Sequence, residues 1–396
     1  MEYFLYYQYA ITALLALILL NFIINNIVYK NVSKFILPLK TLKKGPLVSV
    51  LIPARNEEKN IGRCLRSLSK QDYHNLEILV LDDNSSDETS RVVEEISKKD
   101  TRIRLIRGRS LGRGWKGKSY ACHQLSMEAT GRYYVFTDAD TLHFPNSISS
   151  SLEALISTRL DVLSVFPKQI MVSVHERMVV IFINLAVLAL MPLGMIRKTR
   201  SSRISMANGQ FMLFKRSVYK SIGGHRSIKN DIVEDVAISK QVKKCGYRFM
   251  VFDGRETIYC RMYDGFKNVV RGFSKFIFAA MNYSVIKLGA VISFIMLLFM
   301  LPVFFLPLGL YIFNWPLIVN ILILSQVSII LFIRIAMTFR FKSRFSDIFL
   351  HPLSMLYIAV LSVNSVYQAK YGRGIFWKDR FYSITEGKDM DNQEVK

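Results

Sequence analysis

Apolar positions along this chain follow two patterns: long uninterrupted runs near both ends, and short runs separated by polar turns between them. Residues 9–28 are almost continuously apolar, which is about the length that crosses a bilayer as a helix. Residues 288–307 and 316–336 form two further runs of this kind. The run at 348–366 also contains polar residues and a proline, so a re-entrant or interfacial helix is an alternative to a span there. The pattern predicts N- and C-terminal transmembrane helices around a central region.

The short apolar runs of the central region predict a sheet. They lie at 47–53, 76–81, 103–106 and 133–138. After the first run, Ile61, Leu65 and Leu68 recur at the spacing of one helix face. Strands that alternate with helices build a parallel sheet through right-handed crossovers, so we expect an α/β fold of the nucleotide-binding type. No Gly-x-Gly-x-x-Gly follows the first run and no Walker lysine motif is present, which argues against dinucleotide and P-loop sites.

The run at 133–138 ends in paired acids, Asp138 and Asp140. Alternate residues of a strand point to the same face, so both carboxylates are expected at the carboxyl end of this strand. Ligand crevices of open α/β sheets lie at that end. A bare Asp-x-Asp is more often a loop or a helix cap, but the preceding strand favours a metal site. We predict that Asp138 and Asp140 hold Mg²⁺ or Mn²⁺, which take one or two carboxylates plus the oxygens of a diphosphate.

Composition narrows the choice of partners. Hydrophobic residues make up 51% of the chain and the mean hydropathy is +0.24, so part of it is expected in lipid. The formal net charge of +23 suits an anionic membrane face or phosphorylated substrates. No helix-turn-helix, zinc or RNP-like pattern accompanies that charge, so nucleic acid is not an expected partner. The cysteines lack metal or redox spacing and are predicted to be buried hydrophobes: Cys64, Cys122, Cys245 and Cys260.

The position of the lysines predicts the orientation in the membrane. A cleaved signal peptide begins with basic residues, whereas here they follow the first apolar run. They are Lys30, Lys34, Lys40, Lys43 and Lys44. By the positive-inside rule, the amino terminus lies outside and the chain after Lys30 lies in the cytoplasm.

Several segments together resemble one known family. They are SVLIPARNE at 49–57, LDDNSSD at 81–87, GWKGKSYAC at 114–122, TDAD at 137–140 and VEDVAISKQVKKCGYRF at 233–249. In this order and spacing they are similar to family 2 glycosyltransferases with the GT-A fold, which are inverting enzymes that use nucleotide sugars. The resemblance covers about residues 46–280. It points to a membrane-bound, non-processive branch that includes carotenoid glycosyltransferases such as the hydroxychlorobactene and diaponeurosporenoate enzymes.

The resemblance implies donor-binding roles for a set of residues near the strand ends. These are Pro53, Arg55, Glu57, Asp83, Lys118 and Asp138. Asp83 is assigned to the base, and a carboxylate can accept the imide N–H of uracil, which fits a UDP-linked donor. Asp138 is expected to contact the ribose or the metal, and Asp140 the metal. Lys118 follows a glycine-rich turn and is expected to neutralise the donor; a solvated basic loop is the alternative.

A second acidic pair, Glu234-Asp235, is the predicted catalytic centre. It occupies the family's Glu-Asp position, and inverting transfer needs a general base for the acceptor hydroxyl. Asp235 is the predicted base. The alternative is structural, because acids in the first turn of a helix are stabilised by its dipole. Gly224 and His225 belong to the family's glycine turn, where His225 contacts phosphate or caps the turn.

Arg271 and Lys275 lie one helical turn apart and are predicted to contact the acceptor or the diphosphate. An interfacial basic helix is the alternative, and both can hold. Processive synthases of the family carry Gln-x-x-Arg-Trp near here. This chain has VVRGF at 269–273 instead, which disfavours a long polymer product.

The run at 178–196 is apolar enough to suggest another span. A single crossing there would place Asp138 and Asp235 on opposite sides of the membrane, and they could not share a site. We therefore predict an interfacial helix at 178–196, with its flanking charges in the headgroups.

These inferences predict an ordered set of regions: a transmembrane anchor at 1–29, a GT-A domain at 30–280, C-terminal membrane helices at 281–367 and a basic to polar tail at 368–396. The expected protein is a multi-pass enzyme of the cell membrane whose catalytic domain faces the cytoplasm. It would transfer a hexose from a nucleotide sugar to a membrane lipid such as a carotenoid, polyprenol or glycolipid. A processive polysaccharide synthase and an inactive membrane scaffold are the alternatives, and the intact acids count against the scaffold.

Overall fold

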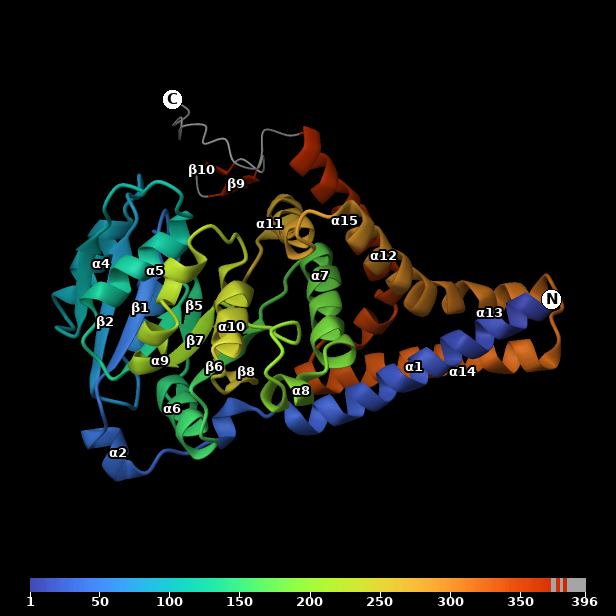
Figure 1. The fold of residues 1–396 in the computed structure, drawn as a ribbon, viewed down its shortest axis with the longest axis horizontal. Coiled ribbons are helices and arrows are strands. Elements are labelled where there is room, and N and C mark those ends of the chain that lie inside the picture. Colours follow the sequence, from blue (N-terminus) through green and yellow to red (C-terminus); the bar gives the residue numbers. More distant parts are fainter. Residues whose placement is uncertain (372–374, 378–379, 383–396) are drawn as a thin grey trace. The chain divides into compact units, whose positions relative to one another are not determined.

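The computed structural model describes residues 1–371, 375–377 and 380–382, apart from the side chains of residues 275, 276, 375–377 and 380–382. Two compact units are present (Figure 1). The sheet unit comprises Tyr29–Ile170 and Leu193–Met262. The helical unit comprises Met1–Val28, Met171–Pro192 and Tyr263–Lys396. Most of the predicted tail at 368–396 falls outside the described residues.

One sheet organises the sheet unit. Its strands are β1 (Val48–Ala54), β2 (Leu76–Asp82), β3 (Ile103–Arg107), β4 (Tyr133–Thr137), β5 (Thr141–His143), β6 (Val162–Gln169), β7 (Phe211–Lys215) and β8 (Phe249–Cys260). They run in the order β3-β2-β1-β4-β7-β6-β8-β5. Neighbours from β3 to β4 are parallel, as are β6 and β8, whereas β7 is antiparallel to β4 and β6 and β5 is antiparallel to β8. The predicted α/β fold with a mostly parallel sheet is confirmed.

The central strands β1 and β4 are buried on both faces, because their consecutive residues are almost all inaccessible. The helices of this unit include α2 (Leu39–Lys44), α3 (Ile61–Leu68), α4 (Thr89–Ser97), α5 (Gly117–Glu128), α6 (Ser147–Ser157), α8 (Leu193–Lys198), α9 (Arg216–Ser221) and α10 (Glu234–Lys244). Ile61, Leu65 and Leu68 are buried on one face of α3, as their spacing predicted. The expectation of four buried cysteines is wrong for Cys245, which is exposed because it follows the last turn of α10 at its C-cap.

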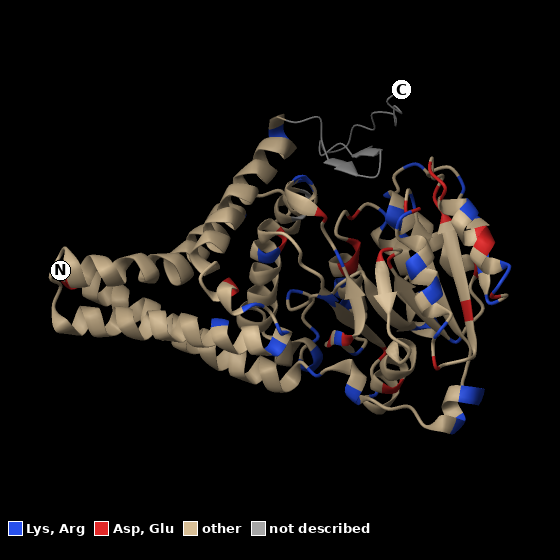
Figure 2. Cartoon of the chain, turned by 180° about the vertical axis from the view of Figure 1, so that it is seen from behind, with Lys and Arg blue, Asp and Glu red and all other residues tan. Residues whose placement is uncertain are grey.

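Three helical segments of the helical unit are long and apolar enough to cross a membrane: α1 (Glu2–Val28), Val285–Tyr311, and α14 (Leu317–Phe341). The second joins α12 (Val285–Ile295) to α13 (Leu301–Tyr311) through a π-helical turn. Figure 2 shows them almost free of charged residues. Each coincides with a predicted span. The run at 348–366 lies in α15 (His351–Tyr371), which is not among the candidate spans found in the described residues.

Polar residues of these apolar helices are satisfied by other parts of the helical unit. Asn25 donates from Nδ2 to the backbone oxygens of Leu188 and Met191, at 2.9 and 2.6 Å. Gln326 of α14 donates from Nε2 to Oε1 of Gln8 in α1, at 2.9 Å. Since lipid offers no hydrogen-bond partner, such contacts fix how apolar helices pair.

The run at 178–196 is not one continuous helix. It comprises α7 (Val174–Leu185), a π-helical turn (Ala186–Leu190) and α8. Residues up to Pro192 belong to the helical unit and α8 belongs to the sheet unit. Its placement in the membrane interface stays a prediction. The helical unit also contains α11 (Gly265–Ala280).

Candidate active site

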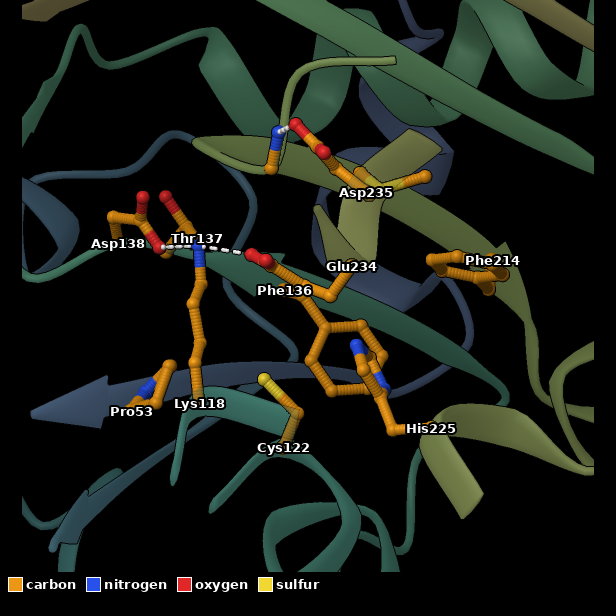
Figure 3. Close-up of a pocket in the computed structure, with 12 residues that line it drawn as sticks. Pro53, Lys118, Cys122, Phe136, Thr137, Asp138, Phe214, His225, Glu234 and Asp235 are labelled. Carbon is orange, nitrogen blue, oxygen red and sulfur yellow. Dashed lines mark hydrogen bonds and ion pairs between the residues drawn. The ribbon is translucent and has the colours of Figure 1, made fainter. Parts of the chain in front are cut away.

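A pocket lies where the chain leaves β1 and β4. β1 pairs with β2 on one side and with β4 on the other, so the order of strands in the sheet reverses direction at β1. Open α/β sheets bind ligands at such a switch point. The lining residues are Pro53, Lys118, Cys122, Phe136, Thr137, Asp138, Gly209, Met212, Phe214, His225, Glu234 and Asp235 (Figure 3). The cavity volume of about 10 Å³ has room for about one water molecule. A nucleotide sugar would therefore have to lie at its mouth.

Lys118, in the first turn of α5, links two acids across this pocket. Its Nζ lies 2.8 Å from Asp138 Oδ1 and 2.8 Å from Glu234 Oε1 (Figure 3). Burial lowers the pKa of Lys118, but the two carboxylates outweigh that effect and hold the pKa well above its ordinary value. Lys118 therefore keeps a positive charge in the pocket at neutral pH.

Glu234 and Asp235 are the first two residues of α10, where the helix dipole favours negative charge. Asp235 accepts hydrogen bonds at Oδ2 from the Gly209 N–H, at 2.9 Å, and at Oδ1 from the Val236 N–H, at 2.8 Å. Burial, with the Glu234 charge beside it, raises the pKa of Asp235 to about 7, against the opposing effects of Lys118 and the two N–H groups. A carboxylate with such a pKa is suited to accepting a proton near neutral pH.

Gly209 is a pocket residue to which the sequence analysis gave no role. A Cβ at this position would lie 3.2 Å from Lys118 Nζ, 3.3 Å from Asp235 Cβ and 3.3 Å from Glu234 Oε1. The absence of a side chain lets the backbone approach all three groups, and its N–H holds Asp235. The sequence feature that could have drawn attention to Gly209 is its place in the Asn-Gly-Gln triplet at 208–210, just before β7.

The predicted metal ligands lie where the strand pattern placed them. Asp138 follows the last residue of β4, and Asp140 precedes β5. Burial raises the pKa of Asp138 and Lys118 opposes it. Burial, together with the charge of Asp140, raises the pKa of the Cys260 thiol. Within the described residues, no group of three or more His, Cys, Asp or Glu side chains could hold a metal. Two partly exposed carboxylates still fit Mg²⁺ or Mn²⁺, which take further oxygens from diphosphate and water.

The predicted nucleoside residues come from the loops after β1 and β2. Pro53 lines the pocket itself. The Arg55 guanidinium donates from Nη1 to the backbone oxygens of Asp83 and Asn84, at 2.7 and 2.9 Å, and so ties the two loops together. Asp83, directly after β2, is 4% exposed. The structure thus shows Arg55 organising the loop that carries Asp83.

Two nearby acids have local structural partners. Asp87 accepts at Oδ1 from the Thr89 N–H at 3.0 Å, just before α4, whose N-cap is Glu88. Glu57 accepts at Oε2 from Asn60 Nδ2 at 2.9 Å, before α3. A direct nucleoside contact by Glu57 stays a prediction.

The glycine turn forms with positive φ at Gly223 (79°) and Gly224 (50°). A Cβ on Gly224 would lie 2.6 Å from the Tyr219 ring, so the turn has no room for a side chain. Nδ1 of His225 shares a 2.8 Å hydrogen bond with the Tyr219 hydroxyl, and its ring packs against Phe136. Burial lowers the pKa of His225 to about 3, so the ring is neutral near pH 7. These contacts favour turn packing over a charged contact with phosphate.

Arg271 and Lys275 lie on α11 of the helical unit. Arg271 is exposed, and the side chain of Lys275 lies outside the described part of the structure. Their contact with the acceptor or the diphosphate stays a prediction.

Comparison with known proteins finds a family resemblance that lies mainly in the sheet unit. Residues 49–223 match the model of Glycosyl transferase family 2. This part of the chain is therefore similar to family 2 glycosyltransferases. Relatives named 4,4'-diaponeurosporenoate glycosyltransferase, from Staphylococcus haemolyticus (strain JCSC1435) and Staphylococcus aureus (strain USA300), are 28% and 29% identical over 231 residues. Each alignment covers 58% of this chain and 60% of the relative, so the chain spans about three fifths of the relatives' length.

The structure also resembles a solved mannosyltransferase from Pyrobaculum calidifontis in complex with GDP-Man and Mn²⁺. The TM-score is 0.51 at 17% identity, over 92% of this chain and 99% of that chain. This likeness confirms the predicted GT-A fold. The match to the family 2 domain ends at residue 223, yet the fold brings Glu234 and Asp235 into the same pocket as Asp138.

Proposed function

We propose that this chain is an inverting glycosyltransferase that moves one sugar from a nucleotide-sugar donor to a membrane lipid. The observation that carries this proposal is the convergence of Asp138, Lys118 and Glu234-Asp235, from β4, α5 and α10, on one pocket. Displacement at an anomeric carbon needs a group that stabilises the departing diphosphate and a base that deprotonates the acceptor. Both kinds of group lie here at the switch point of a family 2 domain.

The donor side of the proposed site uses the loops after β1, β2 and β4. Asp83 would accept an N–H of the base, with Arg55 fixing its loop, and this supports a UDP-linked donor. Lys118 would face the diphosphate, where negative charge accumulates as the bond breaks. Asp138 and Asp140 would hold a divalent ion, which supplies further charge stabilisation when bound.

The acceptor side uses Asp235. An acceptor hydroxyl gives its proton to the Asp235 carboxylate as its oxygen bonds to the anomeric carbon, and the bond from that carbon to the diphosphate oxygen breaks. One displacement inverts the anomeric configuration. A carboxylic acid is already ionised at neutral pH and needs no base, so the raised pKa of Asp235 supports a hydroxyl acceptor.

Three features support a lipid acceptor beside a membrane. The helical unit contains candidate spans, the relatives are named for a carotenoid acid, and the processive Gln-x-x-Arg-Trp motif is replaced by VVRGF at 269–273. The lysines after α1 support a cytoplasmic position of the family 2 domain in a multi-pass protein of the cell membrane. An acceptor held in the bilayer is concentrated in two dimensions, where a soluble acceptor is not.

The test is to incubate membranes that contain the full chain with a panel of radiolabelled nucleotide sugars and Mg²⁺ or Mn²⁺, then to extract the lipids. The proposal predicts that one UDP-sugar labels the lipid fraction and that the Asp235→Asn variant does not. Label found only in the aqueous phase would contradict a lipid acceptor. Absence of transfer from every donor, with the variant and the original chain alike, would favour an inactive scaffold.

A further inference from the structure

A second concave surface lies at the other ends of two central strands, where β4 begins and β7 ends. Its cavity of about 550 Å³ is lined by Arg132, Lys215, Arg216 and Lys220, with the hydroxyl residues Thr130 and Ser217. We call these six residues the basic groove. Tyr133, the first residue of β4, pairs there with Lys215, the last residue of β7. Because β4 has five residues and Asp138 follows its other end, the groove lies about 16 Å from the active site along the strand.

The groove carries an excess of positive charge. Lys215 is matched by Asp161, whose Oδ1 lies 2.8 Å from its Nζ. In the part of the chain that the structure describes, no carboxylate forms an ion pair with Arg132, Arg216 or Lys220. The Arg216 guanidinium donates from Nη1 to the Thr130 carbonyl, a neutral group, at 2.9 Å. Three cationic side chains without an ion-pair partner among the described residues thus line a concave surface.

Glu77, a carboxylate that contacts Thr130 of the groove, forms no ion pair with these cations among the described residues. Glu77 accepts hydrogen bonds from the hydroxyl and N–H of Thr130 at 2.9 and 2.7 Å. It also accepts from the Gly131 N–H at 3.0 Å and the Ser49 hydroxyl. All of these bonds are accepted by Oε1, which thereby fixes the loop before β4.

The spacing of the cations is unfavourable without a ligand. Arg216 and Lys220 are four residues apart on α9, and like charges at that spacing destabilise a helix. Arg132 reaches the same groove from the loop before β4, because the Arg216 N–H bonds to its backbone oxygen at 3.0 Å. A bound anion would remove the repulsion and use the exposed hydroxyl of Ser217.

We propose that the basic groove binds a phosphate-bearing anion at a site separate from the active site. Guanidinium groups recognise phosphate oxygens through paired N–H donors, and lysine adds a compact charge. The volume falls within the range of small-ligand sites and exceeds that of a single inorganic phosphate. The same chemistry serves the headgroup of an anionic phospholipid and a soluble polyphosphate.

The experiment measures binding of two probes to the full chain in neutral detergent by isothermal titration calorimetry. The probes are inorganic tripolyphosphate and a short-chain phosphatidic acid below its micelle concentration. In the Arg132→Gln/Lys220→Gln variant, affinity for at least one probe should fall about tenfold or more, because two charged hydrogen-bond donors are lost. The matched control is Lys98→Gln/Lys99→Gln, which removes the same charge from an exposed turn after α4 and should change affinity less than twofold.

Hydrogen exchange localises the binding and separates the sources. The proposal predicts that a bound probe slows hydrogen exchange of the backbone amides of residues 215–221 in the unmodified chain. This protection should be absent in the groove variant. If the groove variant loses more affinity for phosphatidic acid, the ligand is a lipid headgroup. If it loses more affinity for tripolyphosphate, the ligand is a soluble polyphosphate. Equal affinities in the groove variant, the control and the unmodified chain, for both probes, would overturn the site whatever the transferase activity shows.

Discussion

The pH dependence of transfer follows from the environment of Asp235. An exposed aspartate has a pKa near 3.8, whereas burial and Glu234 raise the pKa of Asp235 to about 7. The raised pKa means that the base is protonated, and inactive, on the acid side. The carboxylate fraction is about one tenth at pH 6, about one half at pH 7 and about nine tenths at pH 8. We therefore expect kcat to rise about tenfold from pH 6 to pH 8.

The assay measures initial rates of label transfer to extracted lipid at saturating donor, so that kcat reports the bound complex. Lys118→Met should shift the profile to higher pH, because the charge of Lys118 lowers the pKa of Asp235. Asp235→Asn should lower kcat by a factor of about 10² to 10⁴. Asp231→Asn is the matched control, since this exposed aspartate precedes α10 and does not line the pocket.

A flat profile between pH 6 and pH 8 would refute the assignment of Asp235 as a base with a raised pKa. An unchanged profile in Lys118→Met would refute the electrostatic coupling between the two residues. Equal losses in Asp235→Asn and Asp231→Asn would show that a general loss of negative charge, and not a lost proton acceptor, lowers the rate.

Three further predictions test neighbouring parts of the site. Asp140→Asn should weaken UDP binding, measured by calorimetry with Mn²⁺, because a charged metal ligand is lost. Asp235→Asn should leave the UDP affinity near that of the unmodified chain. Equal losses of UDP affinity in both variants would contradict the division of roles. Gly209→Ala should lower kcat about tenfold or more without unfolding the chain, because the methyl group crowds the pocket acids, and unchanged kcat would disprove the need for a glycine. Cysteines placed at Lys198 and at Ser86, in a variant without the exposed native cysteine, should react with an impermeant reagent from the same side of the membrane; labelling from opposite sides would exclude the interfacial run at 178–196.

Local signals in the sequence were enough to predict the parallel half of the sheet. The runs that became β1, β2 and β4 are almost entirely buried, so each is mainly apolar and is followed by polar residues. The edge strand β3 is only partly buried and alternates apolar residues with arginines. Asp138 and Asp140 follow such a run directly, which made their position at a strand end predictable. The antiparallel strand β7 is also a short buried apolar run, but its pairing with β4 and β6 joins distant segments, which hydropathy does not show.

The interior of the site depends on tertiary contacts that no short motif encodes. The positions of Lys118, Asp138 and Glu234 in the sequence do not show that one ammonium group bridges two carboxylates. The neutral, buried state of His225 follows from its packing against Phe136 and its bond to Tyr219. Hydropathy likewise overlooks the π-helical turn that interrupts the run at 178–196.

The most direct test of the account is mass spectrometry of lipids extracted after membranes containing the full chain have been incubated with the preferred nucleotide sugar. The account predicts a lipid heavier by one hexose, which forms with the unmodified chain and is absent with Asp235→Asn. A ladder of added hexoses, or a sugar product confined to the aqueous phase, would contradict single transfer to a membrane lipid.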